Sequence, residues 1–143
     1  MASLFVYGTL MFPQVLRAVL GGNLAAEPAR LTGYRRCALR GAWYPGIVED
    51  RRGQVSGSVY RGINFLQLKR LDTYEGEEYR RVPVSVRLAD GLDESTWVYV
   101  LRGSSRRRCL RADWDPEQFI EVRMRAYLRR MHALGVTHGP PQP

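Results

Sequence analysis

The sequence predicts an α+β fold in which a mostly antiparallel sheet curls into a partly closed barrel with helices at its flanks. Runs rich in β-branched and aromatic residues recur along the 143-residue chain, separated by turns that contain Gly or Pro. Apolar residues at helical spacing occur in only three segments. Five or six strands in one sheet must protect their edges, and closure into a barrel does so.

The N-terminal segment predicts a buried strand that leads through a turn into a helix. Residues 3–7 are rich in β-branched and aromatic side chains and end at Gly8. Pro13 suits the first turn of a helix over residues 13–20, which Gly21 ends. The turn at Gly8 leaves backbone N–H groups that could bind a carboxylate or an oxyanion, although a plain strand-to-loop turn has the same pattern.

The next segments predict further strands. Residues 29–39 read as a strand in which Gly33 allows a bulge. A Pro-Gly pair marks a turn at residues 43–46. Residues 47–60 then predict a hairpin whose turn lies at residues 51–53.

Glu75 is the residue of greatest chemical interest. Helical spacing places Phe65, Leu68 and Leu71 on the inward face of a helix that Gly76 ends. Glu75 follows Leu71 by four residues, so it lies on that same face at the last turn. Burial and the helix C-terminus both oppose ionisation, and a carboxyl with a pKa near neutrality can accept and donate a proton at pH 7. The alternative is an ordinary surface Glu at a frayed helix end.

Two strands follow this helix. Residues 79–88 alternate apolar and polar side chains, which predicts a half-buried antiparallel strand, and Pro83 places it at an edge or a bulge. A turn at residues 89–91 leads into a strand over residues 95–101.

The last predicted element is a helix from Asp115, as N-cap, to about residue 134, with Gly135 as its end. We therefore expect a single domain over residues 1–137. Residues 138–143 form a Pro-rich tail that is expected to be loose.

Composition excludes several classes of function. The net charge of +8 suits nucleic-acid binding, but the arginine pairs are scattered and no nucleic-acid-binding motif accompanies them, so nucleic acid is not the expected partner. No apolar stretch is long enough to cross a membrane, and no signal peptide is recognisable, so we expect a cytoplasmic protein. Cys37 and Cys109 have no ligand-like spacing and are expected to be packing residues or free thiols, so the sequence predicts no metal site. A phosphate-binding loop is also absent, so no cofactor is expected.

Two short elements, taken together, resemble a known family. Residues 6–10 read Val-Tyr-Gly-Thr-Leu, and residues 71–81 read Leu-Asp-Thr-Tyr-Glu-Gly-Glu-Glu-Tyr-Arg-Arg. In combination and at this separation they resemble the γ-glutamylcyclotransferase-like superfamily, most closely its γ-glutamylamine cyclotransferase and AIG2-like branch. The resemblance covers roughly residues 4–101 and includes a Pro-containing turn at residues 44–47.

The resemblance implies a γ-glutamylcyclotransferase-like fold, a small mixed and mostly antiparallel β-barrel with flanking helices. It also implies an enzyme in which the substrate's α-amine attacks its own γ-carbonyl, closing 5-oxoproline and releasing an amine. Glu75 would be the general acid/base that moves both protons, without a metal or cofactor. A γ-glutamyl small molecule would be the partner. The residues implied to bind it are Tyr7, Gly8, Thr9 and Leu10, and the position of Tyr79 near the expected cavity makes it a further candidate binding residue.

Neighbouring residues leave alternatives open. Tyr79 either forms a hydrogen bond near the cavity or packs as a core aromatic. Asp72 is expected to be structural, either pairing with Arg70 or Arg80 or capping a turn, while Glu77 and Glu78 are expected to face solvent. The alternative function is a non-catalytic, small-ligand-binding member of the same fold. The sequence identifies neither the amine leaving group nor the oligomeric state.

Overall fold

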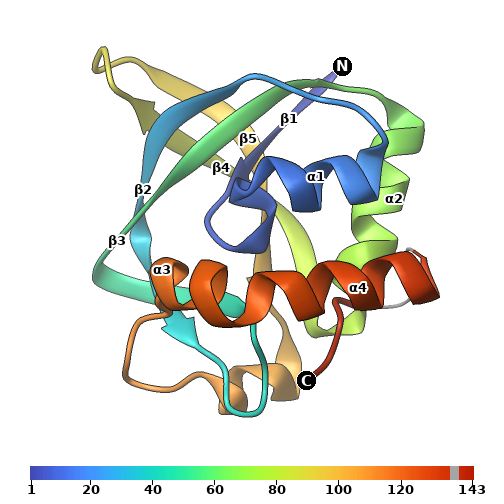
Figure 1. Ribbon diagram of the computed structural model, residues 1–143. Coiled ribbons are helices and arrows are strands. Elements are labelled where there is room, and N and C mark those ends of the chain that lie inside the picture. The colour runs from blue at the N-terminus through green and yellow to red at the C-terminus, as the bar shows by residue number, and fades with distance from the viewer. Residues whose placement is uncertain (136–138) are drawn as a thin grey trace.

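The computed structural model describes residues 1–135 and 139–143, and its centre is a closed barrel with the strand order β1-β3-β2-β4-β5 (Figure 1). Neighbouring strands pair antiparallel, except that β1 and β5 close the barrel in parallel. The predicted mixed, mostly antiparallel barrel is confirmed, and its closure is complete rather than partial. The strands are β1 (Ala2–Val6), β2 (Ala26–Ala38), β3 (Pro45–Ile63), β4 (Tyr79–Leu88) and β5 (Asp93–Leu101).

Helices cover one side of this barrel (Figure 1). They are α1 (Pro13–Leu20), α2 (Phe65–Glu75), α3 (Pro116–Gln118) and α4 (Met124–Leu134), with a π-helical turn (Phe119–Arg123) joining the last two. Helix α1 contacts both α2 and α4. Short 3₁₀ helices lie at Thr9–Met11, Gly76–Glu78 and Gly103–Arg108.

The hydrophobic core has two parts that meet at β1. Phe5 and Tyr7 point into the barrel, where they join residues such as Val59 and Val98. Alternate residues of the same strand point the other way and pack under the helices, in a second cluster that includes Leu16 of α1. Because successive side chains of a strand point to opposite faces, β1 is buried on both sides, as its apolar sequence predicts.

The predicted hairpin over residues 47–60 is wrong, because both halves belong to the single strand β3 and pair with β2. The register jumps from Thr32 opposite Gln54 to Tyr34 opposite Glu49, so residues 50–53 form a bulge rather than a reversal. Gly33, with φ of 87°, allows the matching kink in β2. Local turn chemistry therefore bends the strand here, while pairing on both sides keeps it in the sheet.

Strand β4 agrees with its prediction. Its apolar side chains are more buried than the alternate polar ones, and Val86 is completely covered. Pairing between β4 and β2 is confined to Ala29 with Leu88 and Arg30 with Arg87. Pro83 therefore lies where β4 has a partner only on its β5 side, which is the edge environment that a proline tolerates.

The inward face of α2 is displaced from the predicted one. Leu71 and Tyr74 are buried, whereas Phe65 is 70% exposed and lies under the ammonium of Lys69, 4.9 Å from its ring centre. Asn64 begins the helix with a reciprocal capping box to Gln67. The buried face is therefore confined to the last turns, which are the ones that carry Glu75.

Cys37 and Cys109 form a disulfide, which corrects the expectation of packing residues or free thiols. Backbone bonds from Ala38 to Ala112 and from Leu110 back to Ala38 bring the two segments together. The cysteines are 72 residues apart in the sequence, and a separation of this size carries no pairing signal. The disulfide anchors the segment after β5 to the end of β2.

The last helix begins at the predicted cap, where Asp115 accepts from the amides of Glu117 and Gln118. Its π-helical turn, Phe119–Arg123, was not predicted. The expected domain boundary at residues 137 and 138 lies outside the described residues. Part of the tail that was expected to be loose is in contact with the domain: Pro140 is buried, and Gly139 and Gln142 form hydrogen bonds to Thr73 and Tyr44, while Gln142 and Pro143 are exposed. No helix in the described part of the chain is long and apolar enough to span a membrane.

Candidate functional site

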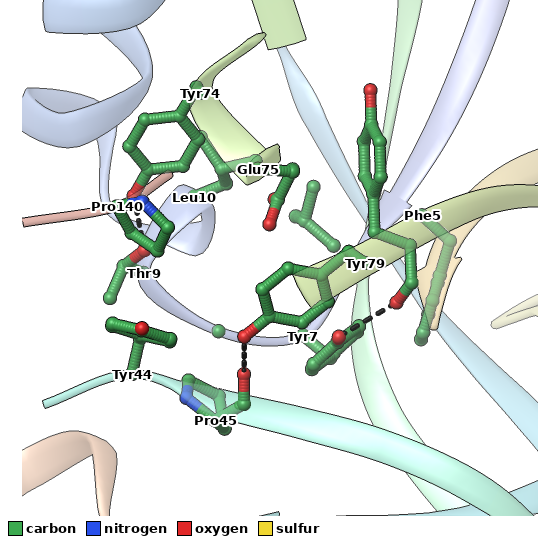
Figure 2. Close-up of a pocket in the computed structure, with 13 residues that line it drawn as sticks. Phe5, Tyr7, Thr9, Leu10, Tyr44, Pro45, Tyr74, Glu75, Tyr79 and Pro140 are labelled. Carbon is green, nitrogen blue, oxygen red and sulfur yellow. Dashed lines mark hydrogen bonds between the residues drawn. The ribbon is translucent and has the colours of Figure 1, made fainter. Parts of the chain in front are cut away.

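The candidate site is a small cavity of about 30 Å³ at one end of the barrel, beside the last turn of α2 (Figure 2). It lies where β1 runs into the Thr9–Met11 turn, between the two parts of the core. All six residues that the sequence predicted for the site line it, and their roles remain to be tested. The residues lining the cavity are Phe5, Val6, Tyr7, Gly8, Thr9, Leu10, Tyr44, Pro45, Tyr74, Glu75, Tyr79, Tyr99 and Pro140.

Glu75 is the last residue of α2 and points into the cavity between Tyr74 and Tyr79 (Figure 2). In the described part of the chain, its carboxylate forms no ion pair and accepts no hydrogen bond. Burial, followed by the negative charges of Asp72 and Glu78, raises the pKa of Glu75 to about 8. The side chain can therefore hold a proton at neutral pH and lose it under slightly alkaline conditions.

The turn after β1 approaches Glu75 from the opposite wall. Gly8 packs so closely on Pro45 that an added Cβ would lie 2.8 Å from the proline Cγ. Arg36 donates from Nη1 to the carbonyl oxygen of Tyr7 at 2.8 Å, which fixes the peptide that precedes Gly8. Among the described residues, no acceptor is found for the Gly8 amide. The turn thus presents a backbone donor beside a carboxyl group, as the sequence suggested.

Three buried hydroxyls form a cluster on one wall of the cavity. Thr9 Oγ1 lies 2.9 Å from the Tyr74 hydroxyl and 3.4 Å from that of Tyr127, and the two tyrosine hydroxyls are hydrogen-bonded to each other. Tyr127 is completely buried and comes from α4, which the sequence motifs did not include. In the sequence, Tyr127 is only a tyrosine within a predicted helix, and such a pattern does not distinguish a residue of the site from a core packing residue.

The aromatic residues of the opposite wall are held by backbone carbonyls. Tyr79 donates its hydroxyl to the carbonyl of Pro45 at 2.5 Å and is almost fully buried. It therefore fulfils both interpretations, since it is a core aromatic with a hydrogen bond at the cavity. Tyr7 donates to the carbonyl of Tyr99 at 2.7 Å, and burial followed by the charge of Glu75 raises the pKa of Tyr7 well above its usual value.

Glu78 does not face solvent, contrary to expectation. It accepts from the Tyr44 hydroxyl at 2.7 Å and from Arg108 Nη1 at 2.6 Å. Arg108 adjoins the disulfide-bonded Cys109, so the segment after β5 reaches the cavity rim. The side chain of Gln142 donates to the same Tyr44 hydroxyl at 2.7 Å.

Asp72 pairs with Arg81, not with Arg70 or Arg80 as expected. Arg81 donates to both of its carboxylate oxygens, at 2.9 and 3.2 Å, and Tyr99 donates to one of them at 2.6 Å. Burial opposes the charge, but these hydrogen bonds and the charge of Arg81 keep the pKa of Asp72 below its usual value. Asp72 therefore stays ionised and contributes to the raised pKa of Glu75. Within residues 1–135 and 139–143, no cluster of His, Cys, Asp or Glu is suited to hold a metal ion.

A comparison with protein families places residues 4–116 in a match to "Gamma-glutamyl cyclotransferase, AIG2-like", which extends beyond the span the motifs suggested. Protein AIG2 C of Arabidopsis thaliana is 34% identical over 120 residues, which cover 82% of this chain and 71% of that protein. AIG2-like protein D of the same plant is 34% identical over 133 residues, which cover 90% and 86% of the two chains.

Solved structures show the same architecture. The solution structure of an Arabidopsis thaliana protein matches with a TM-score of 0.71 at 26% identity, covering 96% of this chain and 95% of the other. A structure described as a gamma-glutamyl cyclotransferase matches with a TM-score of 0.59 at 19% identity, covering 71% and 67% of the two chains. At that identity the second likeness concerns the fold alone.

Proposed function

Because this chain belongs to the γ-glutamyl cyclotransferase, AIG2-like family, we propose that it cleaves a γ-glutamyl amide by cyclisation and releases 5-oxoproline and an amine. The observation that carries the proposal is Glu75, an ionisable side chain that is largely withdrawn from solvent in the cavity and has no partner among the described residues that would hold its charge. A cavity that only bound an apolar or neutral ligand would gain nothing from such a group, whereas proton transfer requires one.

The first half of the reaction needs a base. The α-ammonium of the substrate transfers one proton to the Glu75 carboxylate, and the freed nitrogen lone pair attacks the γ-carbonyl carbon. A C–N bond forms, the carbonyl π electrons move to oxygen, and a five-membered ring closes. The amine and the carbonyl belong to the same molecule, so the attack is intramolecular. Holding the substrate in the folded conformation removes the entropic cost of reaching it.

The second half needs an acid. The oxyanion re-forms the carbonyl and the bond to the leaving nitrogen breaks, while Glu75 donates its proton to that nitrogen. The ring nitrogen, which still carries one proton more than the lactam, passes it to the released amine, which leaves as an ammonium. The carboxylate is thereby regenerated, so one residue serves both steps and no external oxidant or nucleophile is consumed. A pKa of about 8 suits this role, since neither protonation state is strongly disfavoured near neutral pH.

The turn at Gly8 supplies a hydrogen-bond donor for the negatively charged oxygens of the substrate. Its backbone amide has no acceptor among the described residues and can donate either to the substrate α-carboxylate or to the developing oxyanion. The hydroxyl of Thr9 lies on the same wall and is oriented by Tyr74 and Tyr127. In this arrangement the amino-acid head of the substrate lies between Gly8 and Glu75.

A screen of γ-glutamyl amines and γ-glutamyl peptides for 5-oxoproline release tests the proposal. On a substrate found in this way, Glu75→Gln should lower kcat by about 10²-fold or more, because the amide keeps the shape but cannot shuttle a proton. Glu77→Gln is the matched control, since Glu77 is exposed in the adjoining turn, and it should keep full activity.

Two results would contradict the assignment. A folded Glu75→Gln variant with unimpaired turnover would exclude the proton-shuttle role. Saturable binding of 5-oxoproline with no turnover of any γ-glutamyl compound would instead support the alternative of a non-catalytic binding protein.

A further inference from the structure

The cavity beside Glu75 is too small for the proposed substrate. Its volume of about 30 Å³ holds one or two water molecules, whereas small-molecule sites ordinarily enclose about 300–1,000 Å³. A γ-glutamyl amide can therefore enter only if part of the wall moves. The question is which part of the wall can move without disrupting the barrel.

Most of the wall is built into the fold. Phe5 and Val6 belong to β1, Tyr79 and Tyr99 are strand residues of β4 and β5, and Glu75 ends α2. The Gly8 turn is wedged against Pro45 and held by Arg36. Moving any of these segments would break sheet pairing or expose the core.

Tyr44 lies outside the strands, but it is buried and bonded to Glu78, which Arg108 holds in place. Pro140 also lies outside every strand and helix and is buried against the cavity, but no sheet pairing among the described residues holds its segment (Figure 2). It belongs to the segment Gly139–Pro143, which we call the C-terminal strap. The strap has two hydrogen bonds to the rest of the chain in the described structure, from the Gly139 amide to Thr73 O at 3.1 Å and from Gln142 Nε2 to the Tyr44 hydroxyl at 2.7 Å. It makes no ion pair there.

The contact between Gln142 and Tyr44 has a defined polarity. A tyrosine hydroxyl has one proton, and Tyr44 donates it to Glu78, which Arg108 holds in place. The lone pairs of the Tyr44 oxygen are therefore directed away from Glu78 and can accept from the Gln142 amide. The rim of the cavity thus presents a preformed acceptor to the strap, so this end of the chain is held by a specific bond.

We propose that the C-terminal strap is an autoinhibitory cover, which closes the cavity in the arrangement seen and must swing away from Tyr44 and Thr73 before a ligand reaches Glu75. Pro140 covers part of the cavity, and the side chain of Gln142 holds the strap closed through its bond to Tyr44. Opening breaks two hydrogen bonds and exposes the buried ring of Pro140, and it leaves the barrel intact. The strap itself follows from geometry alone, while the choice of ligand in the test below rests on the proposed function.

Hydrogen–deuterium exchange of the amides at residues 7–10 tests the strap without any ligand. A variant that lacks residues 139–143 should exchange these amides faster than the chain that carries them. Gln142→Ala in the full chain should accelerate exchange about fivefold, which is the population change expected for one lost hydrogen bond. Gln118→Ala, at an exposed position of the last helix, is the matched control and should leave exchange unchanged.

Stopped-flow association of 5-oxoproline gives the second readout, and its rate constant should rise in the same order across these variants. Equal exchange at residues 7–10 in the full chain, the shortened chain and Gln142→Ala would overturn the strap proposal. If the shortened chain does not fold, the comparison between Gln142→Ala and Gln118→Ala decides by itself. Faster exchange with no binding of 5-oxoproline by any variant would support the strap and count against the proposed function, so the two failures are distinguishable.

Discussion

Substituting Glu75 should change how the stability of the protein depends on pH. Burial raises the pKa of this carboxyl from 4.5 to about 8 in the folded state, while the unfolded chain retains the lower value. Below pH 4.5 the carboxyl is protonated in both states and the shift has no effect on stability. Between pH 4.5 and pH 8 unfolding releases a proton, so a rise in pH favours the unfolded state, and above pH 8 the loss is complete.

The magnitude follows from the two values. Each pH unit between them lowers the free energy of unfolding by about 1.4 kcal/mol, so the complete loss is about 5 kcal/mol. A domain of this size is stabilised by about 5–15 kcal/mol in total. Ionisation of this carboxyl at alkaline pH therefore removes a large share of the free energy of unfolding. Glu75→Gln does not lose this stability, because its amide does not titrate.

Urea unfolding of wild-type protein and Glu75→Gln at several pH values between 5 and 9 measures this directly. The difference between the two free energies of unfolding should shift by about 4 kcal/mol in favour of Glu75→Gln across that range. Titrations elsewhere in the chain largely cancel in the difference, and the same comparison with exposed Glu77→Gln should be flat. A shift below about 1 kcal/mol would refute the argument that burial keeps Glu75 protonated near neutrality.

Three further results are expected. Cys109→Ser should lower the free energy of unfolding by about 4 kcal/mol, as expected for opening a loop of this length, and a reducing agent should destabilise only the wild type; an unaffected wild type would exclude the disulfide. Gly8→Ala should destabilise by about 1–3 kcal/mol in the same urea assay and impair turnover, because its Cβ would press on Pro45; a neutral effect would mean that the turn is not tightly packed. Tyr127→Phe keeps the ring but removes one hydroxyl from the cluster around Thr9. It should therefore lower the free energy of unfolding by about 1 kcal/mol and lower kcat more than it raises KM. Unchanged stability and kinetics would exclude a positioning role.

The sequence predicted those parts of the site that depend on local periodicity. The spacing from Leu71 to Glu75 placed a carboxyl on the buried face of α2, and Gly8 at the end of an apolar run placed a turn beside it. Both inferences use only neighbouring residues in one element. That Glu75 and the Gly8 turn lie at one cavity depends on contacts between distant segments. The family resemblance suggested it, whereas the periodicity did not.

The parts that the sequence missed depend on contacts between distant segments. The disulfide requires the end of β2 to lie beside Cys109, and no local pattern specifies that neighbour. The predicted hairpin failed for a related reason, since residues 51–53 have turn chemistry but pairing with β2 decides whether the chain reverses. Packing of the C-terminal segments brings Pro140 to the cavity and places Tyr127 behind its wall, where it bonds Tyr74.

The tyrosines around Glu75 explain how the cavity can be rich in hydroxyls and still keep a carboxyl protonated near neutrality. A hydroxyl that donated to the carboxylate would stabilise the charge and lower the pKa. Four of the lining tyrosines direct their protons elsewhere, to two backbone carbonyls and two other carboxylates. These are Tyr7, Tyr44, Tyr79 and Tyr99.

The fifth lining tyrosine, Tyr74, is engaged with Thr9 and Tyr127. Around Glu75 the rings therefore act as apolar walls that exclude water, while their polar ends stabilise the backbone and the carboxylates at Asp72 and Glu78. Those two carboxylates then contribute negative charge that further raises the pKa of Glu75. Tyr44→Phe would release Glu78 and the strap together, whereas Tyr79→Phe would free only the carbonyl of Pro45. Tyr79→Phe is therefore the control for loss of a lining hydroxyl that bonds neither Glu78 nor the strap.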